Sequence, residues 1–202
     1  GFGGPVDDAT LTVIKSHQIA GWDGFPLADW IADLVGVPAV MGNDADVAGL
    51  AEALFGAGKG LSPIFYITLG SGIGGGLIIN GEIYRGCGRG AAEIGHLRMR
   101  DETYTESGKL YYPFLLEAYA SGWGIARLAR EHVGFSEIQS ILPDLVGGKI
   151  ENLNAEHVAI AARRNDPSAT WTLSFSREFL ADAICNMIAL LCPRRIVIGG
   201  GV

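Results

Sequence analysis

The sequence is poor in positive charge and in long apolar runs. Lys and Arg number 15 against 22 Asp and Glu, the formal net charge is −7, and basic residues never gather beyond pairs such as Arg163 and Arg164. A nucleic-acid partner requires a basic surface, so this composition predicts no nucleic-acid binding through this chain. No stretch reaches the roughly 18 apolar residues of a membrane-spanning helix, because the longest, residues 183–192, contains Asn186 and ends before Pro193. We therefore expect no membrane partner.

Cysteine is also scarce. Cys87, Cys185 and Cys192 are odd in number and lack the paired spacing of a zinc knuckle, which favours a reducing compartment over a disulfide framework. We therefore expect a cytoplasmic protein. With 202 residues, of which 49% are hydrophobic, the chain is long enough to bury a core, and this composition excludes intrinsic disorder.

Apolar periodicity and turn residues predict an alternation of helices and strands. The predicted helices are residues 27–35, 44–57, 113–132 and 154–163, and a long one that is opened by Asp166-Pro167. Gly36 is expected to stop the first helix, and Asn154 to cap the fourth. The predicted strands are residues 37–41, 64–69, 77–79 and 195–198, with a hairpin at Asn80-Gly81. The second helix is expected to bury Val47, Leu50, Ala51, Leu54 and Phe55. The long one is expected to be a core helix through the residues that recur every four positions: Trp171, Phe175, Phe179, Ala183, Met187 and Leu191. Because the chain ends in glycines directly after a strand, we expect a fold that continues beyond both ends.

The segment GNDAD at residues 42–46 links a predicted strand to a predicted helix. Asp44 has two interpretations there. It can be the N-cap of the helix, the commonest role of an Asp at such a junction. Alternatively, it can be a general base that takes a hydroxyl proton during phosphoryl transfer to an alcohol, with Asn43 binding a polyol.

The glycine-rich residues 70–76 lie between two predicted strands. They lack the Lys of a Walker A loop and the following helix of a dinucleotide fingerprint. Their amides and the Ser71 hydroxyl are able to form an anion site for nucleotide phosphates. A structural run of glycines that packs against a neighbouring backbone would have the same sequence.

Glu93 and His96, three residues apart, form a third candidate, with Glu117 further along the chain. They are metal ligands, a polar pair on a surface turn, or groups that bind hydroxyls in a cleft.

In their order along the chain, these motifs resemble the ROK family of sugar kinases and sugar-responsive repressors. The segments that carry the resemblance are GGPVD (residues 3–7), GNDA (42–45), TLGSGIGGG (68–76), EIGH (93–96), EAYASG (117–122) and IVIGGGV (196–202). The resemblance implies an α/β fold of the actin-like ATPase, hexokinase type, with two lobes built on ribonuclease-H-like sheets. Residues 1–42 would then complete the smaller lobe and residues 43–202 would form most of the larger one. The family's Asp-x-Gly-Gly-Thr phosphate segment is not among these residues.

The resemblance also implies roles for individual residues. Asp44 would be the catalytic base on the primary hydroxyl of a sugar. The sugar-binding residues would be Gly4, Asn43, Glu93, His96 and Glu117, and the ATP-binding residues would be Gly70, Ser71, Gly72, Gly74, Gly75, Gly199, Gly200 and Gly201. ATP and Mg²⁺ would be required, and the substrate would be a hexose or an N-acetylhexosamine.

One departure from the family concerns zinc. The family commonly holds zinc through the His of the Glu-x-Gly-His motif and three cysteines that precede the position of Glu117, but here residues 111–116 read YYPFLL. We therefore predict no structural zinc, no protein-bound metal and an apolar or aromatic plug in place of the site. The same apolar segment would serve either as core or as the contact surface of a homodimer.

The main hypothesis is an ATP-dependent, glucokinase-like hexose kinase. The alternative is a sugar-responsive transcriptional repressor of the same family, whose DNA-binding element would lie outside this chain. A third hypothesis is an inactive homologue. Intact Asp44 and an intact glycine loop favour the kinase, because a sensor needs neither a proton acceptor nor a phosphate site.

Overall fold

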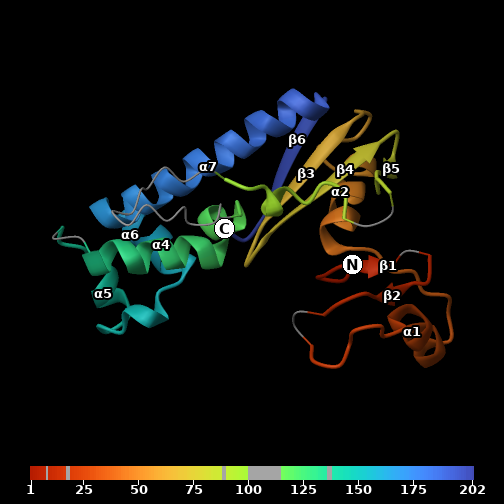
Figure 1. Cartoon of the computed structure of the whole chain (residues 1–202), viewed down its shortest axis with the longest axis horizontal. Coiled ribbons are helices and arrows are strands. Elements are labelled where there is room, and N and C mark those ends of the chain that lie inside the picture. The colour runs from red at the N-terminus through yellow and green to blue at the C-terminus, as the bar shows by residue number, and fades with distance from the viewer. Residues whose placement is uncertain (8, 17–18, 88–89, 100–114, 136–137) are drawn as a thin grey trace, which may run out of the picture. The chain divides into compact units, whose positions relative to one another are not determined.

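A computed structural model of the chain describes residues 1–7, 9–16, 19–87, 90–99, 115–135 and 138–202 (Figure 1). The chain folds into two compact units, each assembled from three separate stretches. The first unit comprises residues 1–68, 74–93 and 193–199, and the second comprises residues 69–73, 94–192 and 200–202.

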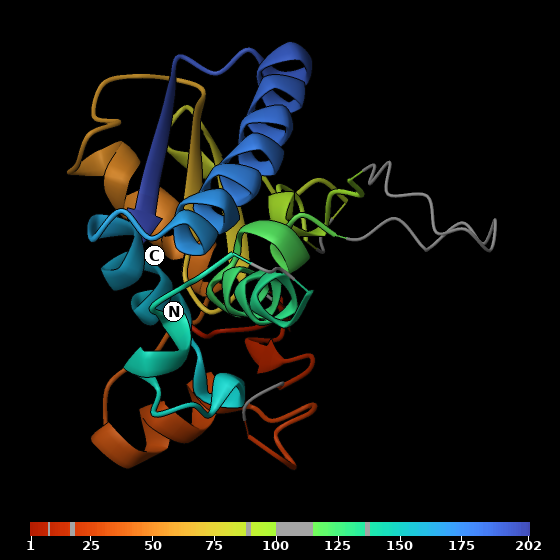
Figure 2. The same cartoon turned by 90° about the vertical axis from the view of Figure 1, so that its left-hand side faces the viewer.

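A four-stranded sheet forms the centre of the first unit. Its strands are β3 (Ile64–Leu69), β4 (Ile73–Ile79), β5 (Glu82–Ile83) and β6 (Arg195–Gly200), in the order β5-β4-β3-β6 (Figures 1 and 2). β4 and β5 pair antiparallel with Ile78 opposite Ile83, and Asn80 and Gly81 between them both have positive φ, at 55° and 80°. This backbone is the type that an Asn-Gly hairpin turn requires, so the predicted hairpin is confirmed.

Helix α2 (Asp44–Leu54) packs on this sheet through small residues. Its buried residues are Ala45, Gly49 and Ala53, spaced four apart, and Ala53 forms a core cluster with Ile64 and Ile78. The expected apolar face was wrong in part, since Val47, Leu54 and Phe55 are exposed. Small residues face the sheet because the helix closely approaches the glycines of β4.

The N-terminal stretch of the first unit holds β1 (Val6–Asp7), β2 (Thr12–Val13) and helix α1 (Leu27–Val35). α1 ends as predicted at Gly36, whose φ of 71° suits glycine and whose N–H donates to the carbonyl of Ala32. The strand expected over residues 37–41 is not formed. A strand requires a partner, and in the described part of the chain this segment has none, leaving Val40 91% exposed.

The second unit is mainly helical. After the short turn η1 (Ile94–His96) come α3 (Glu117–Ala120), α4 (Gly122–Phe135), α5 (Leu142–Leu145), η2 (Ile150–Asn152), α6 (Ala155–Arg163) and α7 (Pro167–Leu191). α7 packs against α3, α4 and α6, and α4 packs against α6 (Figures 1 and 2). Of the helix expected over residues 113–132, residues 113 and 114 lie outside the described part of the chain; the rest holds two helices, because the chain turns at Ser121, whose hydroxyl accepts from the Gly124 amide.

The long helix α7 begins as predicted, with Asp166 as its N-cap and Pro167 in its first turn. Its predicted role in the core is confirmed for Ala183 and Met187, which are buried. It is wrong for Trp171 and Leu191, which are 42% and 38% exposed.

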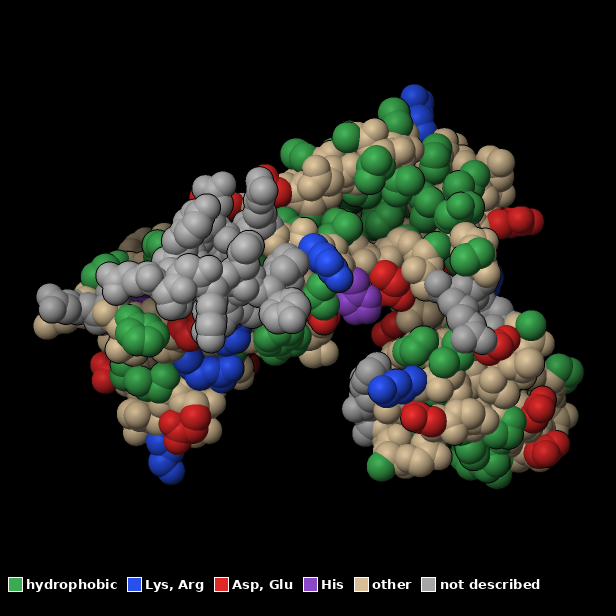
Figure 3. Space-filling view, in the orientation of Figure 1, with side chains coloured by type: hydrophobic (Ala, Val, Ile, Leu, Met, Phe, Trp, Pro, Cys, Tyr) green, Lys and Arg blue, Asp and Glu red, His purple; other side chains and the backbone are tan. Residues whose placement is uncertain are grey.

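The lobe boundary expected after residue 42 stays a prediction, and the division into the two compact units follows other positions, since residues 43–68 group with the preceding ones. Among the described residues, no helix is both long and apolar enough to cross a membrane. On the face drawn in Figure 3, Lys and Arg side chains are scattered among acidic ones within each unit.

Candidate active site

Asn43 and Asp44 lie at the N-terminus of α2, where Asn43 has the capping role that the sequence offered for Asp44. The side-chain oxygen of Asn43 accepts from the amides of Ala45 (2.9 Å) and Asp46 (3.2 Å), so Asn43 is the N-cap. The N-cap interpretation of Asp44 is therefore wrong: Asp44 is the first residue of the helix. Its Oδ1 accepts from the Ala45 amide at 3.0 Å, and its side chain is exposed. An exposed carboxylate at the positive end of a helix is accessible to a substrate hydroxyl.

Asn43 also connects this turn to Gly4. Its Nδ2 donates to the Gly4 carbonyl at 3.2 Å, and the Asp44 amide donates to the Phe2 carbonyl at 3.0 Å. Three of the residues assigned to the sugar site or to catalysis by the sequence, Gly4, Asn43 and Asp44, thus lie together in the first unit.

The glycine-rich residues 70–76 serve two separate purposes. Gly70, Ser71 and Gly72 form the turn, closed by the Gly70 amide donating to the Gly72 carbonyl at 2.9 Å. Gly74 and Gly75, by contrast, belong to strand β4. The expectation of one loop over all seven residues was wrong.

The glycines of β4 permit the close approach of α2. A Cβ on Gly74 would lie 3.0 Å from the Cβ of Ala45, and one on Gly76 would lie 3.1 Å from the Ala45 carbonyl oxygen. The glycines of β4 therefore support the structural interpretation of the glycine-rich residues, in which they pack against a neighbouring backbone. The turn at Gly70–Gly72 remains available for the other interpretation, an anion site, because the Ser71 side chain is exposed.

An open pocket of about 480 Å³ lies entirely within the second unit. Its lining combines the glycine turn, one face of α4, the start of α6 and the end of the chain. The lining residues are Gly70, Ser71, Gly122, Trp123, Ala126, Arg130, Asn154, Ala155, Glu156, Gly201 and Val202. This volume suits a ligand of nucleotide size.

The final glycines, like residues 70–76, have two different roles: some pack against other residues, and one lines the pocket. A Cβ on Gly199 would lie 2.6 Å from the Tyr66 hydroxyl, so Gly199 is required for packing within the first unit. Gly200, at φ 121°, lies directly against the backbone of Leu69. Gly201 lines the pocket, and its amide donates to the Leu69 carbonyl at 3.0 Å.

Glu117 begins the short helix α3, beside the glycine turn. A Cβ on Gly72 would lie 3.2 Å from the Glu117 carboxylate, and the Gly122 amide, just after α3, donates to the Gly70 carbonyl at 2.8 Å. The second unit therefore brings Glu117 next to residues that line the pocket.

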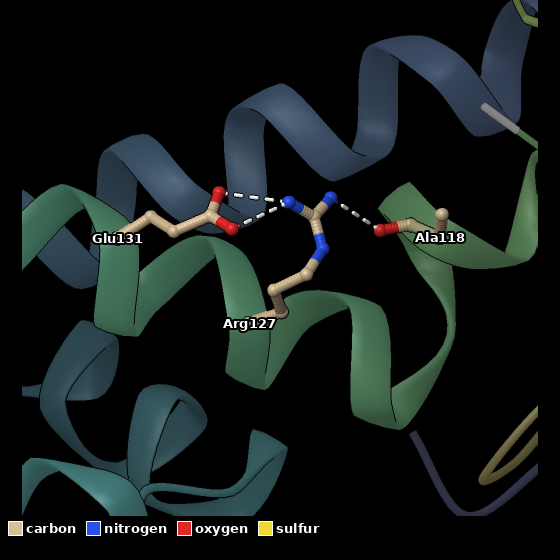
Figure 4. A network of polar contacts seen from close by, with 3 residues as sticks. All are labelled: Ala118, Arg127 and Glu131. Atoms are coloured by element: carbon tan, nitrogen blue, oxygen red, sulfur yellow. Dashed lines mark hydrogen bonds and ion pairs between the residues drawn. The ribbon is translucent and has the colours of Figure 1, made fainter. Parts of the chain in front are cut away.

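Side chains from α4 and α7 hold α3 in place. Arg127 donates to the Ala118 carbonyl at 2.9 Å and forms two bonds to Glu131 at 2.7 and 2.8 Å (Figure 4). Ser176 donates to the Tyr119 carbonyl at 2.7 Å, and the Tyr119 ring stacks on Phe179 with centroids 3.9 Å apart. A fixed α3 fixes the backbone that carries Glu117.

Glu93 and His96 lie in different units. Glu93 is half-buried in the first, and His96 is exposed at the end of η1 in the second. Over the described ranges, no three His, Cys, Asp or Glu side chains gather as a metal site would require. Of the predicted apolar plug at residues 111–116, residues 111–114 lie outside the described residues, so the absence of zinc stays a prediction.

Sequence reasoning missed most of one pocket wall. Trp123, Ala126 and Arg130 share a face of α4 through their i, i+3, i+7 spacing, and Asn154 and Glu156 lie at the start of α6. The helical spacing is visible in the sequence. Its relation to the glycine turn is not, because about fifty residues separate the two.

A model of the ROK family matches residues 1–202, the whole chain. The chain belongs to the ROK family. It is 39% identical over 184 residues to a glucokinase of Halalkalibacterium halodurans, with 90% of this chain and 54% of that protein aligned. It is 32% identical over 204 residues to a glucokinase of Streptomyces coelicolor, covering all of this chain and 63% of that one. This ROK chain thus spans little more than half to almost two thirds of these curated relatives.

The fold also matches a solved structure of the ROK family. A ROK glucokinase from Streptomyces griseus, solved with glucose and AMPPNP, superposes with a TM-score of 0.80 at 33% identity, covering 98% of this chain and 63% of that one. The expected α/β fold of the ROK sugar kinases, which is of the actin-like ATPase type, is thereby confirmed.

Proposed function

We propose that the protein is an ATP-dependent hexose kinase, glucokinase-like, that phosphorylates the primary hydroxyl of a sugar. The observation that carries the proposal is the exposed Asp44 carboxylate at the N-terminus of α2, in a chain 39% identical to a glucokinase. Phosphoryl transfer to an alcohol requires a group that accepts the hydroxyl proton as the oxygen attacks. Asp44 is held in place by its backbone amide, which donates to the Phe2 carbonyl, and by the capped first turn of α2, and its side chain remains accessible.

In this proposal Asp44 takes the proton of the primary hydroxyl, which then attacks the terminal phosphorus of ATP, and ADP leaves. The other sugar hydroxyls are bound by Gly4, Asn43, Glu93, His96 and Glu117. Asn43 has a restricted part in this, since its oxygen already caps α2 and its amide already donates to Gly4. The cap holds Asp44 in place, so Asn43 contributes even where it makes no sugar contact.

The pocket of the second unit is the proposed nucleotide site. Gly70, Ser71 and Gly72 would hold phosphate oxygens through turn amides and the Ser71 hydroxyl. Gly201 would contact the nucleoside end, while Gly74, Gly75, Gly199 and Gly200 would support the site through packing. Mg²⁺ would arrive with ATP and neutralise phosphate charge, since Mg²⁺ is usually held by substrate phosphates, waters and one or two carboxylates.

The repressor alternative has a structural counterpart, because a ROK family transcriptional regulator superposes on the chain with a TM-score of 0.78 at 26% identity. The fold alone therefore does not separate a kinase from a sensor. The exposed Asp44 and the pocket beside the glycine turn favour the kinase, because a sensor requires neither.

A hexose or an N-acetylhexosamine is the proposed substrate. The protein is proposed to be cytoplasmic and to bind neither membrane nor nucleic acid through this chain. A homodimer is the assembly to test. The test of function is ADP release from Mg²⁺ and ATP by the full-length gene product, measured with no sugar and with each of a panel of hexoses and N-acetylhexosamines. Release that depends on a sugar supports the kinase and identifies its substrate class. A folded protein that binds a sugar and releases no ADP would contradict the kinase and support the sensor.

A further inference from the structure

The pocket of the second unit has an aromatic wall that no motif assigns. Trp123 lies at the start of α4, lines the pocket and is 45% exposed. Its amide donates to the Ser71 carbonyl at 3.4 Å, which ties it to the glycine turn. A large aromatic ring left half exposed on the wall of an open pocket offers a flat apolar face to a ligand.

Two further residues of α4 line the pocket beside Trp123. Ala126, one turn further along the same face, is small and buried, and Arg130 follows one turn later. The guanidinium of Arg130 donates to the carbonyls of Leu153 (3.0 Å) and Glu151 (3.3 Å). These bonds tie α4 to the turn before α6, whose first residues also line the pocket.

The lining residues at the start of α6 are held in place by a capping box. Asn154 accepts from the His157 amide at 2.9 Å, and its amide donates to the His157 ring nitrogen Nδ1 at 3.2 Å, forming a capping box. Glu156, which also lines the pocket, is exposed. The lining therefore combines an aromatic ring with polar residues, a combination that suits a flat heterocycle with polar edges.

We propose that Trp123 is the stacking surface for the nucleobase of the bound nucleotide. This deepens the proposed function and rests on its nucleotide site. The phosphates lie at the glycine turn, and the base lies against the indole of Trp123. Stacking does not depend on hydrogen-bond pattern, so ATP and GTP both benefit from it.

The test compares nucleotide affinities of the wild type, Trp123→Ala and Trp123→Phe by calorimetry with Mg²⁺-ATP and Mg²⁺-GTP. Loss of one aromatic–base stack predicts at least a fivefold weakening of both nucleotides in Trp123→Ala and near wild-type binding in Trp123→Phe. Inorganic tripolyphosphate, which has no base, is expected to bind the wild type and Trp123→Ala equally.

Trp171 supplies the matched control. It is 42% exposed in the same unit, but its ring stacks on His132 and Phe175 rather than lining the pocket. ATP is expected to change the tryptophan fluorescence of the wild type and of Trp171→Phe, and to leave that of Trp123→Phe unchanged.

Three results would overturn the proposal. ATP affinity that is equal in the wild type and Trp123→Ala would refute the stacking of the base on Trp123. Equal weakening of ATP and tripolyphosphate in Trp123→Ala would give Trp123 a structural role only. A wild type that binds no nucleotide would refute the nucleotide site itself, and with it the proposed function, which distinguishes this failure from the other two.

Discussion

Replacing Arg127 with Met tests whether α3 and the turn at Ser121 that follows it, the α3 corner, are held by the bond to the Ala118 carbonyl or by the ion pair with Glu131. Arg127 makes a charged hydrogen bond to the Ala118 carbonyl at 2.9 Å and an ion pair with Glu131 one turn along the same helix. The two side chains of the pair are 26% and 51% exposed. A surface pair at i, i+4 contributes about 0.3–0.5 kcal/mol, whereas a hydrogen bond from a charged group contributes about 1.5–3 kcal/mol. The bond to Ala118 therefore dominates.

We expect Arg127→Met to lower the free energy of unfolding by about 2–3 kcal/mol, and Glu131→Gln, the matched control, to lower it by less than about 1 kcal/mol. Urea unfolding followed by circular dichroism measures both. Because α3 carries Glu117, Arg127→Met is also expected to raise KM for the sugar more than Glu131→Gln does. Equal losses of stability in the two variants would refute this reasoning and assign the corner to the ion pair.

Three further predictions concern the base, the cap of α7 and zinc. Asp44→Asn is expected to lower kcat by a factor of about 10²–10⁴ while the sugar Kd, measured by calorimetry, changes little, and near wild-type turnover would remove Asp44 from the mechanism. Asp166 is buried and accepts from Ala169, Ser140 and Ile141, so Asp166→Ala is expected to cost about 2–4 kcal/mol in urea unfolding, and a loss below about 1 kcal/mol would contradict this. Metal analysis of the purified protein is expected to find no stoichiometric zinc, and one zinc per chain would overturn the interpretation of the missing cysteines.

Local signals in the sequence predicted the elements whose geometry is decided locally. Strand β3, the Asn80-Gly81 hairpin, the Asn154 cap of α6 and the Asp166-Pro167 start of α7 are all present. Each depends on residues adjacent in the chain, such as a side chain that satisfies amides two or three residues away.

Elements that depend on distant partners were predicted less well. The strand expected over residues 37–41 required a neighbouring strand, and the buried face of α2 depends on glycines thirty residues further along the chain. The N-cap of α2 is Asn43 and not Asp44, the residue that the sequence offered for that role beside the role of general base, because both residue types cap helices and only the backbone geometry decides.

The candidate site shows the same division. The motifs identified Asp44, the turn at Gly70–Gly72 and Glu117, which the structure places at helix starts or at the glycine turn. They did not identify Trp123 or Arg130, because a pocket wall is made by packing α4 beside a turn from a distant part of the chain.

The measurement that tests the central claim most directly is identification of the product by ³¹P and ¹H NMR after incubating the protein with Mg²⁺, ATP and a hexose that stimulates ADP release. The account predicts a phosphate monoester on the primary hydroxyl, formed in equal amount to ADP and not formed by Asp44→Asn. A phosphate on another hydroxyl, or ADP with inorganic phosphate and no sugar ester, would contradict it.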